Sequence, residues 1–449
     1  MRGFGKPVYR RLVTAALVLS AALLLMMTLA PPQATAQSDP PSDIPTDIDI
    51  DIETGADAGG DVGLLAGLLQ SYLSDAGREV SIRGFQGALS SQATIQSLTI
   101  ADDQGIWLVL RDVTLDWSRS ALLSRRVEVN ELSAGEIHIR RLPDTGEDSA
   151  LPSPTAWPAF QLPELPVSVN IGELRADRVV IEAAVTGQER AILRLEGGMQ
   201  LEGGEGNARF EARRIDDKEG EFRFSGNFDN ETRNLTLDLL LSEGPEGIAA
   251  ALLDIPGQPS MALSVIGSGP IDDFEADIQL ATDGQDRVTG SVRITDAQPQ
   301  GDLPEGLHFI ADIAGDLRPL MAPDLHAFFG SESRLRAQGA RTTDGAISLY
   351  ELTFNTRTMR LVGRADLDAS GLPRVVDLIA DIAREDGAPV VLPGTDGQTT
   401  LYEAALNIEY DSTVSQDWLI IAGIDRLAMP DLNLERIDLE ARGRLSPPN

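Results

Sequence analysis

Four acidic side chains at alternate positions have the spacing in this chain that most resembles a metal-binding loop. They are Asp47, Asp49, Asp51 and Glu53. An EF-hand calcium loop also needs glycine at its sixth position, for a sharp turn, and glutamate at its twelfth, which binds calcium through both oxygens. Those two positions hold Ile52 and Ala58. We therefore interpret the segment as a solvated acidic linker and not as a calcium site.

The histidines do not form a metal or catalytic set. The chain contains only His138, His308 and His326, and none has a second histidine or a carboxylate at metal-ligand spacing on a recognisable helix. His138 alternates with two isoleucines, so we expect it on the polar face of a strand. There is no phosphate-binding loop and no nucleophile elbow, and 70 acidic residues make carboxylate pairs by chance. We predict no enzymatic activity, no catalytic residue, no metal site and no cofactor.

Composition limits the partners and the fold class. The net charge of −33 would repel a nucleic acid, so we expect no nucleic-acid binding. The absence of cysteine excludes disulfides, thiol catalysis and cysteine-bound zinc. Hydrophobic residues make up 42% of the chain and aromatic residues only 5%, while 42 glycines punctuate the aliphatic runs. This mixture is typical of many short strands joined by tight turns.

One sequence motif occurs twice in the chain. "VEVNELSAGEIHI" (residues 127–139) and "VNIGELRADRVVI" (residues 169–181) carry matching residues at seven positions, and "AGIDRLAMPDLNL" (residues 422–434) is a looser third copy. In the first copy Val127 and Val129 share one side, and Ile137 and Ile139 return to an apolar face after "SAGE". We therefore predict that each copy is a β-hairpin with one apolar face.

Alternating strands recur from Val80 to the end of the chain, with short helical interruptions at residues 245–254 and 319–330. If about 400 residues form strands of roughly 10 to 12 residues each, turns included, about 35 strands would make a sheet on the order of 150 Å long. We predict a mainly β fold: a long, repetitive, curled sheet with an apolar groove, an N-terminal transmembrane helix and a few short helices.

Eight apolar residues of the two close copies are the candidate lining of this groove. Two interpretations remain open, because the same residues would also suit a closed core in which they pack against one another. The eight candidates are Val127, Val129, Ile137, Ile139, Val169, Ile171, Val179 and Ile181.

The chain divides into six predicted segments. Residues 1–37 hold a basic flank and an uncharged run at residues 12–30, long enough to nearly cross a bilayer, although "ATA" at residues 34–36 also offers a signal-peptidase site. We predict a single-pass inner-membrane anchor and a periplasmic body. The remaining segments are an acidic linker (38–60), an amphipathic helix (61–77), a first hairpin array (78–142), a Pro-rich linker (143–166) and a second β-repeat array (167–449).

The ordered combination of these features resembles the TamB family, the inner-membrane subunits of the translocation and assembly module. The resemblance rests on the anchor, on residues 80–143 ("VSIRGFQGALSS" to "EIHIRRLP") and on residues 242–294 ("SEGPEGIAAALLDIPG" to "VTGSVRI"). It implies an AsmA-like envelope protein, related to bridge-like lipid-transfer proteins, that supports protein secretion and outer-membrane biogenesis.

The resemblance also implies partners. They are an Omp85-type (TamA-like) outer-membrane protein, the inner membrane, and a cargo of phospholipid or unfolded outer-membrane protein. Family members are usually longer and end in a domain that engages the outer-membrane partner, whereas this sequence ends at "ARGRLSPPN", so that partner is expected from the family alone. The rival interpretation is a structural or adhesin-like exported β-repeat protein, which would not need a retained anchor.

Overall fold

The computed structural model describes residues 79–142 and 168–445, apart from residues 88–89, 125, 188, 298–305, 343–344, 370 and 396–397. The predicted anchor, acidic linker, amphipathic helix and Pro-rich linker lie outside the described residues. Among the residues that are described, no helix has the length and apolar character needed to cross a membrane.

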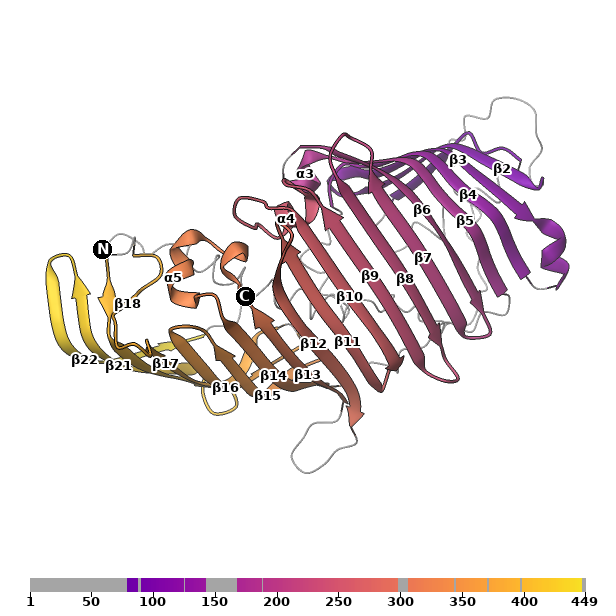
Figure 1. Ribbon diagram of the computed structural model, residues 1–449. Coiled ribbons are helices and arrows are strands. Elements are labelled where there is room, and N and C mark those ends of the chain that lie inside the picture. Colours follow the sequence, from indigo (N-terminus) through magenta and orange to yellow (C-terminus); the bar gives the residue numbers. More distant parts are fainter. Residues whose placement is uncertain are drawn as a thin grey trace.

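One open sheet contains all 22 strands of the described chain (Figure 1). The first eleven are β1 (Glu79–Arg83), β2 (Gln92–Asp102), β3 (Gly105–Ser118), β4 (Arg126–Ile139), β5 (Ser168–Ile181), β6 (Ala191–Glu202), β7 (Glu205–Arg214), β8 (Gly220–Asp229), β9 (Asn234–Glu243), β10 (Met261–Pro270) and β11 (Asp273–Thr282). The others are β12 (Gln285–Ala297), β13 (Gly306–Gly315), β14 (Ser333–Thr342), β15 (Ile347–Asn355), β16 (Met359–Leu367), β17 (Pro373–Ala383), β18 (Val390–Val391), β19 (Thr400–Leu401), β20 (Glu403–Asp411), β21 (Asp417–Met429) and β22 (Leu432–Arg444).

Each strand pairs with the next along the chain, with few exceptions. β17 pairs with β20, because the two-residue strands β18 and β19 leave the main ladder, and β19 pairs with β21 instead. At about 4.8 Å per strand, the ladder from β1 to β22 is on the order of 90 Å long. The predicted mainly β sheet is confirmed. The predicted 35 strands and 150 Å were too high, because most strands are 9 to 14 residues long before any turn is added.

The hairpin interpretation of the repeated phrase was wrong. The two close copies are the single strands β4 and β5, the one parallel pair among the described strands, and they align in register from Val127 with Val169 to Ile139 with Ile181. Their apolar residues are spaced by two, three, two, three and two positions. Each spacing of three holds an extra residue at a register irregularity, which keeps all six apolar residues on one face.

The third copy does contain a turn. It spans the end of β21 and the start of β22, where Leu427 pairs with Leu434 and Met429 with Leu432. The looser match of this copy therefore reflects a different structure, a hairpin in place of one irregular strand.

Insertions at one edge of the sheet follow every fourth strand. After β5, β9, β13 and β17 the chain has run along an even number of further strands and so returns to the same edge. We call these insertions (residues 182–190, 244–260, 316–332 and 384–402) the rim. The rim contains α3 (Ala183–Thr186), α4 (Ile248–Leu252), η2 (Arg318–Leu320), η3 (Pro323–Leu325), α5 (His326–Phe329) and the pair β18–β19.

The rim insertions touch one another along the edge. α3 contacts α4, and α5 contacts β18, although several strands separate each pair in the ladder (Figure 1). The two predicted helical interruptions are confirmed as the second and third insertions. A further short helix, η1 (Arg119–Ser124), joins β3 to β4 away from the rim.

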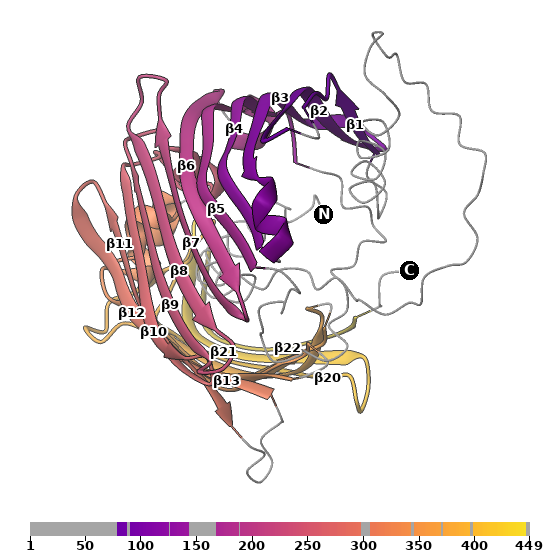
Figure 2. The ribbon, with the colours of Figure 1, turned by 90° about the vertical axis from the view of Figure 1, so that its right-hand side faces the viewer.

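The sheet is strongly bent along its length. In Figure 2 the first strands, β1 to β4, run along the top, β8 to β12 run down one side, and β20 to β22 lie along the bottom. Twisted antiparallel strands coil in this way when one face is apolar and the other is solvated. The result is a single-layered open arc.

Candidate functional site

An unbroken row of apolar pairs crosses the sheet from β2 to β22. Directly paired residues of neighbouring strands lie on the same face, so the pairing register shows which side chains share a side. Starting from Ala93, every partner in turn is apolar or glycine. This apolar row is Ala93, Leu115, Leu132, Leu174, Gly197, Phe210, Phe224, Leu239, Val265, Ile278, Gly290, Ile313, Leu335, Phe354, Leu361, Ala380, Leu406, Ala422 and Leu439.

The neighbouring row on the opposite face is mostly polar. It begins at Thr94, one residue from Ala93, and all but four of its members carry a polar or charged side chain. This polar row is Thr94, Thr114, Ser133, Arg175, Glu196, Glu211, Arg223, Leu240, Ser264, Gln279, Thr289, Ala314, Arg334, Asn355, Arg360, Asp381, Ala405, Gly423 and Asp438. Along these two rows, therefore, one face of the sheet is apolar and the other is mostly polar.

The structure brings all eight candidate lining residues together on the apolar face. They form four parallel pairs: Val127 with Val169, Val129 with Ile171, Ile137 with Val179, and Ile139 with Ile181. Leu132 and Leu174 of the apolar row lie between these pairs in the same two strands. Val129 is 7% exposed and the other seven are partly buried. That they line a groove stays a prediction.

A cluster of apolar side chains from six consecutive strands lies on this face, and its members pack against one another. Its buried members come from β9 to β13, with partly buried residues of β8 beside them, and none comes from a helix or loop of the described chain. They are only 1 to 8% exposed. We call this the strand cluster; its buried members are Leu237, Leu239, Val265, Phe274, Ala276, Ile278, Val292 and Ala311.

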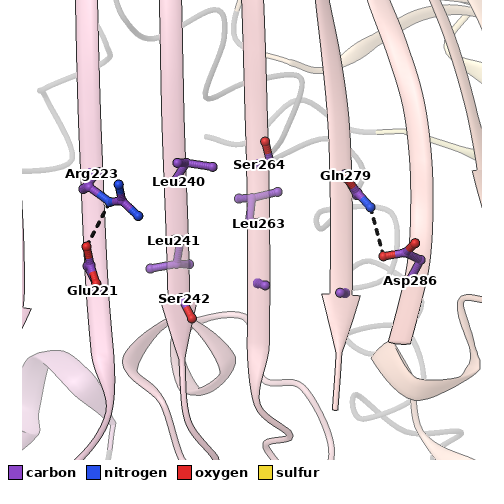
Figure 3. A pocket seen from close by; sticks show the side chains of 11 residues that line it. Glu221, Arg223, Leu240, Leu241, Ser242, Leu263, Ser264, Gln279 and Asp286 are labelled. Atoms are coloured by element: carbon purple, nitrogen blue, oxygen red, sulfur yellow. Dashed lines mark hydrogen bonds and ion pairs between the residues drawn. The ribbon is translucent and has the colours of Figure 1, made fainter. Parts of the chain in front are cut away.

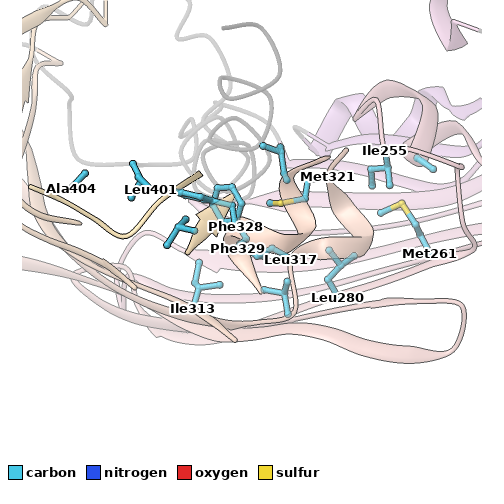
Figure 4. Close-up of a cluster of buried hydrophobic side chains, with 14 residues drawn as sticks. Ile255, Met261, Leu280, Ile313, Leu317, Met321, Phe328, Phe329, Leu401 and Ala404 are labelled. Carbon is cyan, nitrogen blue, oxygen red and sulfur yellow. The ribbon is translucent and has the colours of Figure 1, made fainter. Parts of the chain in front are cut away.

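Farther along the sheet, rim residues cover part of the same face. Ile255, Leu317, Met321, Phe328, Phe329 and Leu401 of the rim are buried together with strand residues that include Met261, Leu280, Ile313 and Ala404 (Figure 4). The rim thus packs onto the apolar face of the strands from β10 onward. The strand cluster has no such cover among the described residues.

Aromatic rings lie over glycines of neighbouring strands, a feature that sequence reasoning missed. A Cβ atom added to Gly267 would come within 2.4 Å of Phe274 Cζ, and one on Gly197 within 2.6 Å of Phe210 Cδ1. Gly339 is related in the same way to Phe309, and Gly443 to Trp418. Glycine has no side chain, so the ring of the neighbouring strand packs over the glycine backbone. This contact also fixes the register of the two strands. The only sequence signal is glycine at an apolar position of an alternating strand.

The described chain also has a shallow depression of about 320 Å³, but it lies on the polar face (Figure 3). Arg223, Leu240, Ser264 and Gln279 of the polar row are among the residues that line it. At its ends Arg223 Nε lies 2.9 Å from Glu221 Oε1, and Gln279 Nε2 donates to Asp286 Oδ1 at 2.9 Å. This hollow is separate from the apolar face.

Charges are paired on the polar face and at the edges. Arg334 Nη2 lies 2.5 Å from Asp312 Oδ2, and hydrogen bonds from Arg334 and Arg336 lower the pKa of Asp312 to about 2. At the rim edge, burial opposes ionisation of Asp216, but hydrogen bonds from Arg214 and from the Ile192 amide outweigh it and lower its pKa. These pairs keep charge away from the apolar row.

The histidines have structural surroundings. His138 lies on the polar face, as predicted, with Nε2 2.7 Å from Glu182 Oε1. His308 is 4% exposed beside Tyr350, and His326 Nε2 donates to the Met321 carbonyl oxygen at 3.1 Å. No group of three possible metal ligands occurs among the residues that the structure describes.

No family model matches the sequence, and comparison with curated proteins and with solved structures gives no significant match. The arguments for function therefore rest on the geometry of the sheet and on the sequence.

Proposed function

We propose that this chain is a non-enzymatic conduit of the envelope, of the TamB-like translocation-and-assembly type. The apolar face lines a groove inside the arc of the sheet and carries the acyl chains of phospholipid between the two membranes. The observation that carries the proposal is the apolar row, which runs through nineteen strands without a polar side chain.

A face of this kind needs an apolar partner. Apolar surface left in water is unfavourable by roughly 25 cal/mol per Å², and contiguous apolar patches on soluble proteins mark binding sites. Two sheets packed face to face would remove that surface, but all described strands belong to one layer. Acyl chains have the chemistry to fill the face, and their headgroups would remain in water at the edge opposite the rim.

The sequence supports a membrane location. The uncharged run at residues 12–30, with its basic flank, supports an inner-membrane anchor and a periplasmic body, which would place one end of the groove at a bilayer. Fractionation with N-terminal sequencing checks this point. A soluble mature chain that begins at Gln37 would contradict the anchor but not the export.

A second candidate cargo is an unfolded, strand-forming outer-membrane protein, and β22 favours it. Among the described strands, β22 pairs only with β21, and Leu432 and Leu439 are 46% and 47% exposed on the apolar face. A free edge of this length can add a strand through backbone hydrogen bonds. In this function an Omp85-type (TamA-like) protein would receive the client.

Photo-crosslinking from the eight candidate lining residues tests the proposal. A photoreactive side chain at each position should label phospholipid, and labelled polypeptide would indicate the second cargo. Matched probes at Asn170 and Glu128, on the polar face of the same strands, should label neither.

Charge variants separate a groove from a closed core. Ile171→Glu and Val129→Glu should leave the protease-resistant sheet intact and abolish the cross-links, whereas Asn170→Glu, on the opposite face, should change neither. Unfolding of both apolar-face variants, with no cross-links from any of the eight positions, would instead support a structural or adhesin-like β protein.

A further inference from the structure

Three exposed aliphatic side chains lie along the edge of the sheet opposite the rim. β16, β20 and β22 all begin at the rim, so the turns that follow β16 and β20, and the end of β22, lie at the other edge. These segments carry Leu372, Val414 and Leu445, which are 44%, 83% and 41% exposed. Val414 is the most exposed large apolar residue of the described chain. At about 4.8 Å per strand, the three positions span roughly 15 to 20 Å.

Backbone hydrogen bonds join the three segments. The Ser412 amide of the second turn donates to the Arg374 carbonyl oxygen, just after the first turn, at 2.8 Å. The Leu445 amide donates to the Gln416 carbonyl oxygen, at the end of the second turn, at 2.9 Å. The three aliphatic side chains therefore belong to one continuous stretch of the edge, and their spacing is fixed by the sheet.

An aspartate organises each of the two turns. Asp411 Oδ1 accepts a hydrogen bond from the Thr413 amide at 2.9 Å, and the Asp411 carbonyl oxygen accepts one from the Val414 amide at 3.1 Å. In the other turn, Asp368 Oδ1 accepts one from the Leu372 amide at 3.0 Å. Small polar residues and glycine ordinarily occupy such turns. The aspartates and the backbone build these turns, so the aliphatic side chains are not needed to form them.

Charges of both signs lie beside the aliphatic side chains. Arg374 and Arg444 are exposed, and Arg444 Nε lies 3.6 Å from Asp417 Oδ1. A zwitterionic phospholipid headgroup carries a phosphate and an ammonium group, so it can pair with a guanidinium and a carboxylate at the same time. Arginine suits the phosphate, and aliphatic side chains suit the acyl layer just below the headgroups.

We propose that this stretch of the edge docks on a zwitterionic phospholipid bilayer, with Leu372, Val414 and Leu445 inserted among the headgroups and Arg374 next to lipid phosphate. Three separate side chains in a line suit a flat, fluid surface, whereas a protein partner would need a contiguous apolar patch. The inference goes beyond the proposed function, because this contact needs no groove. If the groove carries lipid, the contact marks where lipid could enter or leave it.

Nitroxide labels at single cysteines test the contact, because the chain has no cysteine of its own. The variants are Leu372→Cys, Val414→Cys and the control Leu252→Cys, an exposed leucine of the rim at the opposite edge. Each labelled full chain would be reconstituted with vesicles of phosphatidylcholine and phosphatidylethanolamine. Electron paramagnetic resonance then measures how accessible the label is to oxygen, which enters bilayers, and to a nickel complex, which stays in water.

The ratio of oxygen to nickel accessibility should rise several-fold at positions 372 and 414 when vesicles are present, and should not change at position 252. Replacing Val414 in the labelled Leu372→Cys chain provides a second measurement. Val414→Ser should reduce the rise at position 372 several-fold, whereas Val414→Leu should preserve it. Both replacements lie at an exposed turn, so neither removes a buried contact.

Three results would overturn the contact. The labels at 372 and 414 could remain in water when vesicles are present, or the label at 252 could enter the bilayer equally, which indicates unspecific adsorption. Protection of position 414 from nickel without vesicles would indicate association with a second copy of the chain instead. None of these results bears on the groove, whose bound phospholipid is measured separately, and loss of that phospholipid would leave the contact standing.

Discussion

Glu243 is a carboxylate at the rim edge of the apolar face, and a short helix depends on it. It is only 7% exposed, and its two oxygens accept hydrogen bonds from the Ile248 amide at 3.1 Å and the Ala249 amide at 2.8 Å, at the start of α4. Replacing Glu243 with glutamine removes the charge that favours this helix end. We expect a loss of about 1 kcal/mol and faster hydrogen exchange at both amides.

Glu246→Gln is the control for this change. Glu246 is exposed and pairs with Lys218 at 3.2 Å, a surface contact that contributes little to stability. If Glu243→Gln and Glu246→Gln left the exchange of the α4 amides equally unchanged, the capping role of Glu243 would be wrong.

Asp312 gives the polar face a predictable pH dependence. Its folded pKa of about 2 lies below the ordinary 3.8, so its ionised form stabilises the fold above about pH 4, and this contribution is lost as the pH falls through 2. Urea unfolding of wild type and Asp312→Asn should therefore differ slightly at pH 6 and converge near pH 2. A difference that grew on acidification would contradict this ion-pair assignment.

At the scale of elements, aromatic rings and glycines set the register of neighbouring strands. Gly267→Val would place side-chain atoms where the Phe274 ring lies, so we expect a destabilisation of about 1 to 3 kcal/mol. Thermal unfolding of the purified chain measures it. Gly423→Val is the control, because the nearest neighbour of a Cβ there is Asp438 Oδ1 at 3.9 Å. Equal melting temperatures for the two variants would show that the Phe274 ring does not fill the space above Gly267.

The sequence predicted the strands better than their connections. Alternation located the strands and the apolar face correctly, and proline and glycine located the second and third rim insertions. The spacing of three between Ala134 and Ile137 was ambiguous, because a tight turn and an extra residue within a strand both accommodate it. The signal that we missed was the identical spacing of apolar residues in the two copies, which begin at Val127 and Val169. Two strands with identical spacing can pair in parallel, because the extra residues of one strand then lie beside those of the other.

At the scale of the whole molecule, the continuous apolar face could be predicted from the sequence. The packing of the rim insertions on part of that face could not. Residues of one alternating strand share a face whatever the tertiary structure, so the eight candidate residues fell on one side. The placement of all insertions along one edge depends on the parity of strands between them. That count emerges only once each strand from β6 to β17 is known individually.

The central claim is that the apolar row binds acyl chains, and the most direct test is the phospholipid bound to the purified full chain, measured by native mass spectrometry. Val265→Asp puts a charge into the row within the strand cluster, and Ser264→Asp puts the same charge one residue away on the polar face. We expect bound phospholipid in wild type and in Ser264→Asp, and its loss in a folded Val265→Asp variant. Equal lipid content in the two variants, or unfolding of Val265→Asp alone, would contradict an open lipid-binding face.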